Sequence, residues 1–335
     1  MPETAVGDDR VSPASTIVPS TWFGNRSGLG RIRLRGKDRR DFLHRLSTNA
    51  ILPLKPGEGA LTALLNPKGR LLDLLQVLAL EEELLLIASD GAVEKVLSWL
   101  EAFHFREEVA IEPWDSDCVG LYGEEACSFL SRLAGEDVPP LPYGHHRSLT
   151  LGGVSARAAG SFPLAGQGFL LLTAPGSSPS LQETLQGAGA REASGQMLEA
   201  LRVAAGVPAW GRELSEEFNP WEAGLDAAVS LSKGCYVGQE IVARIHTYKK
   251  LQRRLTGLEV EEGSEAPTVG ATVLHQAEPV ATITSAAISP LSTRPLALAF
   301  LPLPLSSISQ ALEIAEGESS RHARVVPLPF LNPAN

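Results

Sequence analysis

The chain has 335 residues, of which 44% are hydrophobic and 20% are charged. This length predicts two or three domains, and the composition excludes an intrinsically disordered chain and a coiled coil. The formal net charge of −10 argues against a general nucleic-acid-binding surface. The longest apolar run, Leu71 to Leu80, is too short to cross a bilayer, so we expect no membrane partner.

The cysteine content indicates a reducing compartment. The three cysteines, Cys118, Cys127 and Cys235, are too few for a disulfide scaffold, and they lack the C-x-x-C spacing of a zinc site. The first residues contain neither the basic nor the apolar segment of a signal peptide. We therefore expect a cytoplasmic protein, with residues 1–20 as a loose N-terminal tail, and we assign no metal-ligating residue.

An α+β unit is predicted after this tail. Residues 31–35 alternate with period two, which indicates a strand, and Asp38 is placed to begin a helix whose buried face comprises Phe42, Leu43 and Leu46. Two apolar runs, residues 60–65 and 71–80, follow as strands joined by a type I turn. A third strand over residues 83–88 then leads to a helix with an apolar stripe over residues 93–100.

The same order of elements recurs further along the chain. Residues 34–46 align without a gap with residues 121–133, and six pairs are identical: Leu34, Gly36, Phe42, Leu43, Arg45 and Leu46 match Leu121, Gly123, Phe129, Leu130, Arg132 and Leu133. Predicted strands over residues 148–151, 154–158 and 169–173 and a helix over 180–186 follow. The pattern favours two duplicated α+β units, the alternative being chance agreement in a Leu-rich chain.

The last third of the chain changes character. A helix rich in Leu and Ala is expected over residues 196–205, and an irregular connection over residues 209–232 follows it. Short strands separated by Gly, Pro and Glu then predict a small β-barrel or sandwich. The strands expected here cover residues 255–260, 271–274, 280–284, 296–300 and 323–326.

Two basic segments interrupt the acidic background. Residues 31–45 carry seven Lys or Arg against two Asp, and residues 233–254 carry six against one Glu, so each has a net charge of +5. Such a concentration of positive charge can attract an anionic ligand. The alternative is that both segments are solvated faces without a ligand.

The segment from Lys233 to Glu240 holds the strongest candidate for chemistry. Two glycines flank Cys235, and a helix is expected to begin near Gly238. The amide groups of a helix start, together with Lys233, would favour the thiolate of Cys235. The alternative is a buried structural cysteine in a glycine-containing turn.

These residues are similar to the K-G-C-Y-x-G-Q-E signature of the YgfZ-type folate-binding proteins, which are relatives of the glycine-cleavage T-protein (aminomethyltransferase). The similarity continues through residues 201–208, 242–244, 36–49 and 64–73, and it covers roughly residues 28–330. It implies an α+β fold in which two related ferredoxin-like α+β units and a C-terminal β-barrel form a ring around a folate channel. The domains expected are residues 21–117, 118–248 with the signature segment, and 249–330.

The resemblance also implies a function. Proteins of this branch bind tetrahydrofolate and assist the assembly or repair of iron–sulfur clusters on client enzymes, including tRNA-modifying ones. Carried over by motif, Cys235 and Lys233 would be the reactive pair. The residues expected to bind the reduced folate are Asp73, Glu222, Tyr236, Gln239, Glu240 and Arg244, and the basic segments would suit its glutamyl tail.

Two departures from the T-protein pattern bear on the reaction. T-proteins have a Glu at the position of Ala204, and they have an acidic pair near Asp73 where one acid remains here. Both departures weaken the alternative function, a folate-dependent aminomethyl or one-carbon transferase. A third interpretation, an RNA-contacting module that uses the basic segments, conflicts with the acidic background.

Overall fold

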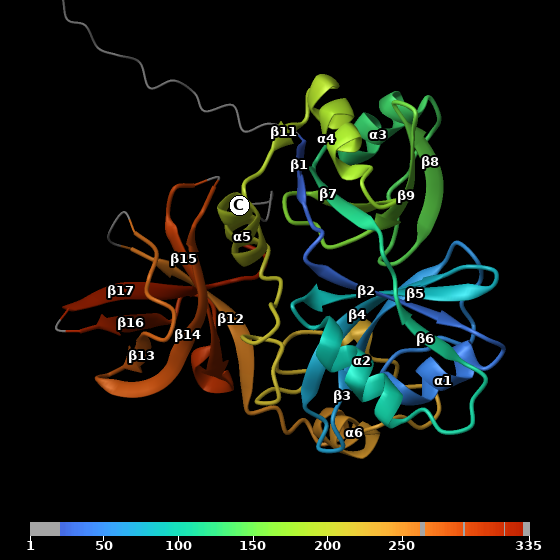
Figure 1. Ribbon diagram of the computed structural model, residues 1–335. Helices are drawn as coiled ribbons and strands as arrows, with labels where there is room; N and C mark the ends of the chain where they lie inside the picture. The colour runs from blue at the N-terminus through green and yellow to red at the C-terminus, as the bar shows by residue number, and fades with distance from the viewer. Residues whose placement is uncertain (1–20, 262–264, 291, 318, 331–335) are drawn as a thin grey trace, which may run out of the picture.

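A computed structural model describes residues 21–261, 265–290, 292–317 and 319–330, so the tail expected over residues 1–20 lies outside the described ranges. Figure 1 shows two α+β units, one above the other, with a β-barrel beside them and α5 between the upper unit and the barrel. Within the described ranges, no helix combines the length and the apolar character needed to cross a membrane.

The first unit is a five-stranded antiparallel sheet in the order β3-β4-β5-β2-β6. Its strands are β2 (Leu29–Arg35), β3 (Gly59–Leu65), β4 (Leu71–Ala79), β5 (Glu83–Asp90) and β6 (Ala110–Pro113), and its helices are α1 (Arg39–Leu46) and α2 (Val93–Ala102). The predicted elements of this unit are confirmed, including the buried face of α1. Asp38 precedes α1 as expected, but its carboxylate accepts a hydrogen bond from Glu108 N (2.8 Å) instead of capping the helix.

The second unit is a six-stranded sheet in the order β11-β1-β7-β10-β9-β8. Its strands are β1 (Trp22–Asn25), β7 (Asp117–Gly123), β8 (His146–Leu151), β9 (Val154–Gly160), β10 (Gln167–Thr173) and β11 (Arg191–Glu192), and its helices are α3 (Ala126–Ala134) and α4 (Ser178–Gly187). The two sheets meet through one apolar cluster that includes Leu85, Ile87, Leu170 and Leu172. This contact holds the units together.

The two units repeat one topology. The strand order β8-β9-β10-β7 of the second sheet corresponds to β3-β4-β5-β2 of the first, and α1 and α3 follow the corresponding strands β2 and β7. The fifth position differs, because β6 occupies it in the first sheet and β1 occupies it in the second. The shared order supports duplication over chance agreement.

A connecting region leads from the second unit to the barrel. It comprises α5 (Gly195–Ala204), an irregular segment with the short 3-10 helix η1 (Asp226–Ala228), and α6 (Gln239–Thr247). Ser194 caps α5 by accepting a hydrogen bond from Met197 N (3.2 Å), and Gly206 follows the helix with a φ of +67°. A left-handed residue after the last turn is a common helix end, and glycine adopts it without strain.

The C-terminal part is a closed barrel in the order β12-β15-β14-β13-β16-β17, which decides between the barrel and the sandwich. Its strands are β12 (Arg253–Val260), β13 (Thr272–His275), β14 (Glu278–Ile288), β15 (Pro295–Pro302), β16 (Ala311–Glu316) and β17 (Ser319–Val326), with η2 (Leu303–Leu305) after β15. Of the barrel strands described, only β16 was not predicted. Its Ala and Glu residues have low strand propensity, and only Leu312 and Ile314 are buried.

Candidate functional site

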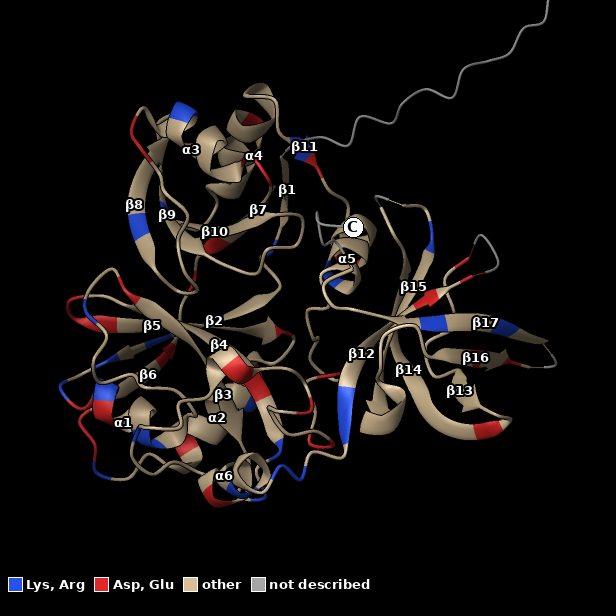
Figure 2. Cartoon of the chain, turned by 180° about the vertical axis from the view of Figure 1, so that it is seen from behind, with Lys and Arg blue, Asp and Glu red and all other residues tan. Residues whose placement is uncertain are grey.

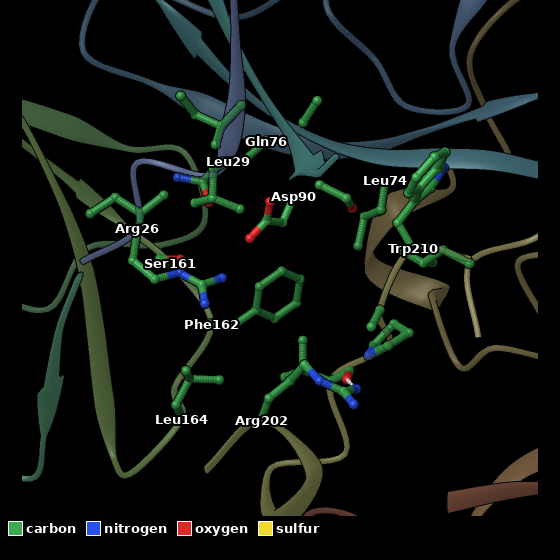
Figure 3. Close-up of a pocket in the computed structure, with 18 of the residues that line it drawn as sticks. Arg26, Leu29, Leu74, Gln76, Asp90, Ser161, Phe162, Leu164, Arg202 and Trp210 are labelled. Carbon is green, nitrogen blue, oxygen red and sulfur yellow. Dashed lines mark hydrogen bonds between the residues drawn. The ribbon is translucent and has the colours of Figure 1, made fainter. Parts of the chain in front are cut away.

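A cavity of about 330 Å³ lies between the two units and the region that connects them to the barrel (Figure 3). This volume is within the range of small-molecule sites, roughly 300–1,000 Å³. Strands β3, β4 and β5 form one wall, residues of the second unit form another, and α5 with residues 207–214 closes the third side. The site is thus assembled from segments that are far apart in the sequence.

The cavity walls are mainly apolar, with a few polar groups. Phe162 and Trp210 contribute aromatic rings, and several leucines, including Leu74, complete the apolar surface. Gln76 is buried, and its Nε2 donates a hydrogen bond to Gly160 O (2.8 Å), which leaves the amide oxygen available. Ser89 and Ser161 add hydroxyl groups. Such walls suit a flat, largely apolar ligand with a polar edge.

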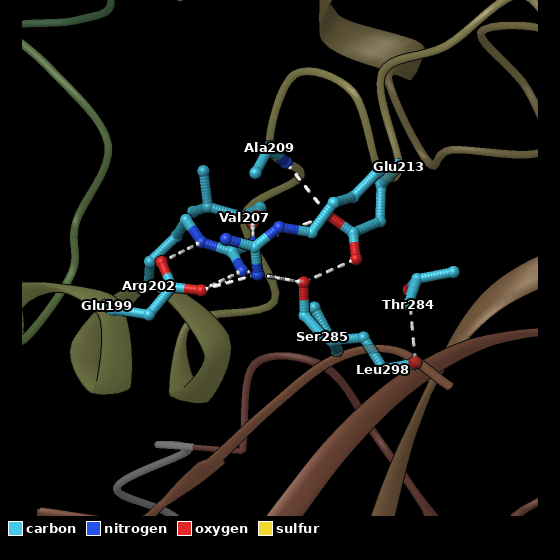
Figure 4. Close-up of polar contacts among 9 residues, drawn as sticks. Glu199, Arg202, Val207, Ala209, Glu213, Thr284, Ser285 and Leu298 are labelled. Carbon is cyan, nitrogen blue, oxygen red and sulfur yellow. Dashed lines mark hydrogen bonds and ion pairs between the residues drawn. The ribbon is translucent and has the colours of Figure 1, made fainter. Parts of the chain in front are cut away.

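Charged residues on the α5 side of the cavity neutralise one another (Figure 4). Arg202 donates to Glu199 from Nε (2.8 Å) and Nη2 (2.7 Å), and Arg212 donates to the same carboxylate (2.7 Å). Hydrogen bonding to Arg202 is the main reason that the pKa of Glu199 falls to about 2. These three residues therefore form a fixed wall with one excess positive charge, which Glu213 offsets through its contact with Arg202.

Glu213 extends this network into the barrel. Its side chain is fully buried, and it accepts hydrogen bonds from Ala209 N (2.9 Å) and from Ser285 Oγ of β14 (2.7 Å). Arg202 reaches both Glu213 (3.5 Å) and Ser285 (2.7 Å). The network therefore fixes α5, the connecting segment and the barrel relative to one another.

Two other charged residues line the cavity without such partners, Arg26 and Asp90. Arg26 lies between β1 and β2, and Asp90 is the last residue of β5. Within the described part of the chain, neither side chain makes a hydrogen bond or an ion pair, and Arg26 Nε is buried. The sequence analysis assigned no role to either residue. The position of Asp90, a charged residue at the end of a buried strand, could have indicated a binding role, whereas no sequence motif includes Arg26.

Asp73, predicted to bind folate, does not line the cavity. Its side chain is fully buried and accepts a hydrogen bond from Ser89 N (3.0 Å), while Oδ1 has no hydrogen-bond partner. Burial raises the pKa of this carboxyl to about 6. Its neighbours Leu74 and Gln76 face the cavity instead.

Glu222 is likewise outside the lining. Its carboxylate accepts a hydrogen bond from Asn219 N (2.9 Å) and forms ion pairs with Arg70 (3.3 Å) and Arg253 (3.1 Å). Arg253 is the first residue of β12. Its ion pair with Glu222 therefore joins this loop to the barrel. This position gives Glu222 an evident structural task, and its assignment to folate stays a prediction.

The segment from Lys233 to Arg244 lies against the outer side of the first unit, where Figure 1 shows α6 below β3. Lys233 Nζ donates to the carbonyls of His44, Ser47 and Asn49 (3.1 Å to Asn49), at and just beyond the end of α1. A cation is favourable at this negative end of a helix. Burial lowers the pKa of Lys233 to about 8.

Cys235 is exposed, whereas Cys118 is buried and Cys127 is partly buried. Tyr236 packs in the core, with Lys233 Nζ 5.1 Å from its ring centroid, and burial raises its pKa to about 12. Gln239 donates to Gly234 O (3.4 Å), and Glu240 and Arg244 are exposed on α6. The signature segment therefore lies on the outer side of the first unit with Cys235 exposed and Tyr236 buried, and none of its residues lines the cavity.

The two basic segments do not line the cavity either. Much of the first is neutralised locally, since Arg33 and Arg35 pair with Glu83 and Lys37 pairs with Glu108. The second follows α6 into β12. Among the described residues, no group of three or more His, Cys, Asp or Glu side chains is arranged to hold a metal ion.

Comparison with known proteins agrees with this architecture. Residues 23–233 match the model of the GCVT N-terminal domain, and residues 253–332 match that of the glycine cleavage T-protein C-terminal barrel domain. A putative chloroplastic transferase of Arabidopsis thaliana, At1g60990, is 31% identical over 87% of this chain and 67% of its own length. An aminomethyltransferase of Geobacillus kaustophilus is 28% identical over 91% of this chain and 85% of its own length.

A solved structure shows the same fold. The crystal structure of the glycine cleavage system aminomethyltransferase T from Bartonella henselae superposes with a TM-score of 0.80, at 21% identity, over 93% of this chain and 86% of that one. Both family models and this superposition span the two units and the barrel. The chain therefore belongs to the glycine cleavage T-protein family.

Proposed function

We propose that this chain is a YgfZ-type member of the family, which binds tetrahydrofolate in the cavity and serves iron–sulfur enzymes as an accessory protein in cluster assembly or repair. The observation that carries the proposal is the composition of the cavity. Aromatic rings and leucines could enclose a pterin, and Gln76 Oε1, Arg26 and Asp90 offer polar contacts that no described residue occupies.

The same composition favours binding over group transfer. Transfer of a one-carbon unit to or from a folate nitrogen needs a group that moves a proton at that nitrogen. Leu74 supplies no such group, Glu199 is held by two arginines, and neither Ala204 nor Asp73 lines the cavity. Among the described residues of the lining, Asp90 is the one carboxylate without a protein partner, and it lies exposed at the end of β5 rather than buried in the cavity wall.

Folate binding is tested by titrating the protein with tetrahydrofolate or its stable 5-formyl derivative and following Trp fluorescence. Saturable quenching with a micromolar dissociation constant, about −8 kcal/mol, is expected. Trp210 lines the cavity, so Trp210→Phe should remove much of the signal while calorimetry still detects binding. Absence of binding near millimolar ligand would overturn the proposal.

The accessory role rests on the exposed surface around Cys235, which is separate from the cavity lining. An exposed thiol can react with, or transiently ligate a group on, another protein, whereas a buried one cannot. Lys233 anchors this segment through its bonds to the end of α1.

Complementation tests this role. In a strain that lacks the protein and has low activity of iron–sulfur enzymes, including a tRNA-modifying one, Cys235→Ser should fold normally and fail to restore activity. Cys127→Ser, at a partly buried cysteine on α3, is the matched control and should restore it. Full rescue by Cys235→Ser would contradict the accessory role without affecting folate binding.

The alternative function is an aminomethyltransferase-like one-carbon transferase, which the similarity to curated aminomethyltransferases favours. Incubation with aminomethylated carrier protein and tetrahydrofolate distinguishes the two. Formation of methylenetetrahydrofolate at a catalytic rate would establish the transferase. Binding of tetrahydrofolate without this product supports the accessory protein.

A further inference from the structure

The second basic segment of the sequence is largely unpaired in the structure, whereas the first is paired throughout. Each of the seven cations in residues 31–45 pairs with a carboxylate or donates to a backbone carbonyl. Within the described part of the chain, four cations of the second segment form neither a side-chain hydrogen bond nor an ion pair: Arg244, Lys249, Lys250 and Arg254. Their charges are therefore available to another molecule.

These cations follow one another along the surface. Figure 2 shows basic residues on α6, on the loop after it and at the start of β12. Lys68, also unpaired among the described residues, joins them from the β3–β4 turn, because a Cβ built on Gly69 of this turn would be 3.1 Å from Ile241 Cβ in α6. All five cations are exposed, and Glu240 is the one acidic residue of the sequence from 233 to 254. We call the five residues the α6 strip: Lys68, Arg244, Lys249, Lys250 and Arg254.

The dipole of α6 accounts for only part of this strip. A cation is favourable in the last turn of a helix, which applies to Arg244. It does not apply to Lys68, in a turn, or to Arg254, in a strand. The carboxylates of Glu216 and Glu222, in the connecting segment, are paired with other cations. Since like charges repel one another, an unneutralised strip across three elements points to an anionic partner.

The strip begins beside an exposed thiol. Cys235 lies three residues before Gly238, which precedes α6. A Cβ built on Gly238 would be 2.7 Å from Asn66 O, in the same turn as Lys68. A molecule bound along the α6 strip would therefore have one end near Cys235.

Exposed leucines lie near the same place and favour a protein as the partner. Leu231 is 56% exposed and Leu52 is 48% exposed. The segments that carry them are joined by a hydrogen bond from Ser230 N to Thr48 O (3.0 Å). Exposed aliphatic side chains beside charged ones are typical of a protein interface, which has an apolar centre and a polar rim. A nucleic acid would also be repelled by the acidic remainder of the chain.

We propose that the α6 strip is a docking surface for an acidic face of a protein partner, which it directs toward Cys235. The inference rests on the accessory role proposed above and adds the charge of the partner. The distance along α6 from Gly238 to Tyr248 is about 15 Å, so carboxylates spread over this length can contact the strip while another group reaches the thiol. The docking is electrostatic, so it speeds association and weakens with salt.

Thiol–disulfide exchange at Cys235 tests the docking in the purified protein. The chain carries Cys127→Ser, which leaves Cys235 as the accessible thiol because Cys118 is buried. The probes are peptides of equal length, rich in Glu, Gln or Lys, whose single Cys is activated as a 2-pyridyl disulfide. The Cys235 thiolate attacks the peptide sulfur, a protein–peptide disulfide forms, and the leaving thiolate takes up a proton as pyridine-2-thione, whose absorbance gives the rate. At low ionic strength the Glu peptide should react about ten-fold faster than the Gln peptide, and salt should remove this advantage.

A charge-reversed variant and a matched control locate the effect. Lys249→Glu with Lys250→Glu should abolish the preference for the Glu peptide, while an unchanged rate with the Gln peptide shows that the thiol is intact. Lys55→Glu with Arg106→Glu makes the same change of charge at exposed residues outside the strip, whose side chains are also unpaired among the described residues, and should keep the preference. Equal rates of the Glu and Gln peptides with the wild type, or an equal loss in both variants, would overturn the inference.

Complementation separates this inference from the accessory role. In the strain described above, the Lys249/Lys250 variant should restore less iron–sulfur enzyme activity than the Lys55/Arg106 variant at equal expression. If Cys235→Ser fails but the Lys249/Lys250 variant restores full activity, the accessory role stands and the docking inference is wrong. Full activity with Cys235→Ser would overturn both. Binding of a tRNA transcript or of phosphatidylglycerol vesicles that the Lys249/Lys250 substitutions abolish, without a preference for the Glu peptide, would assign the strip to RNA or lipid and overturn the inference.

Discussion

Asp73 and Leu74 are consecutive residues of β4, but only Leu74 lines the cavity, while the Asp73 carboxylate accepts a hydrogen bond from Ser89 N of β5. The acid that sequence similarity marks for folate is thus a buried group behind the cavity wall. Ser89 itself lines the cavity. Asp73 is therefore placed to position the wall, whatever further role it has.

We expect Asp73 to make stability depend on pH. Burial raises its pKa from 3.8 to about 6, so the folded state favours the protonated form. This contribution is fully present below pH 4 and is lost as the pH rises through 6. Since each pKa unit corresponds to 1.36 kcal/mol, the wild type should lose about 3 kcal/mol relative to Asp73→Asn over this range. Urea unfolding of both proteins from pH 4 to 7 measures it, and a constant difference would contradict it.

His146 should have the opposite pH dependence. Arg157 can only donate, so Nδ1 of His146 accepts from it (3.0 Å) and Nε2 donates to Ala79 O (3.0 Å), which joins β8 to β4 through the neutral ring. Burial lowers the pKa of His146 to about 4. The resulting stability is present above pH 6.5 and is lost as the pH falls through 4, about 3 kcal/mol in total.

The measurement for His146 is the unfolding free energy of wild type and His146→Gln between pH 7 and pH 4. The advantage of the wild type should shrink as the pH falls. Because Asp73 acts in the reverse direction over an overlapping range, the pH profile of the wild type alone underestimates both effects. An advantage that persists at pH 4 would show that the ring is not held neutral.

Gly238 should tolerate no side chain. It precedes α6 with a φ of +80°, and a Cβ there would be 2.7 Å from Asn66 O and 3.0 Å from Gly69 Cα. Gly153, in the β8–β9 turn, has a similar φ of +87° but open space around it. Gly153→Ala should cost about 1 kcal/mol from backbone strain alone, and Gly238→Ala about 2 kcal/mol more from the contact. Equal costs in thermal unfolding would refute the close approach of α6 to the β3–β4 turn.

Glu213 is expected to be the most sensitive member of the charged network. Glu213→Ala would leave Arg202 and Ser285 without their buried partner, so it should cost about 3–5 kcal/mol. Arg212→Gln removes an ion pair whose side chains are 39% and 35% exposed and should cost less than about 1 kcal/mol. Chemical denaturation of the two variants compares them, and a cost for Glu213→Ala as small as for Arg212→Gln would show that the barrel is held by other contacts.

Local sequence patterns located the helices and strands, whereas the residues of the cavity come together only in the folded chain. Strand β2 alternates and α1 has a one-sided apolar face, so local patterns located both. Every residue of β4 is buried, so no period-two pattern distinguished the side of Leu74 from that of Asp73. The cavity also joins Arg26, Asp90 and Arg202, whose proximity depends on the packing of three parts of the chain rather than on any local signal.

The residues of the signature around Cys235, unlike those of the cavity, could be located from the sequence. These residues are contiguous, so the motif alone located them in one segment, in which Cys235 is exposed. What the motif could not predict was that Lys233 binds carbonyls near the end of α1, because that contact spans 184 to 189 positions of sequence.

Strand β1 precedes the first unit in sequence but pairs with β7 and β11 of the second sheet. During synthesis, β1 leaves the ribosome first and must wait, without its partners, until the whole first unit has emerged. A fragment that ends before β7 therefore carries an unpaired strand, and one that begins after β1 leaves β7 with an open edge, which invites association with other chains. A single cut in the chain therefore cannot yield both α+β units as complete fragments. To express the two units separately, β1 would have to be moved from the first fragment to the second.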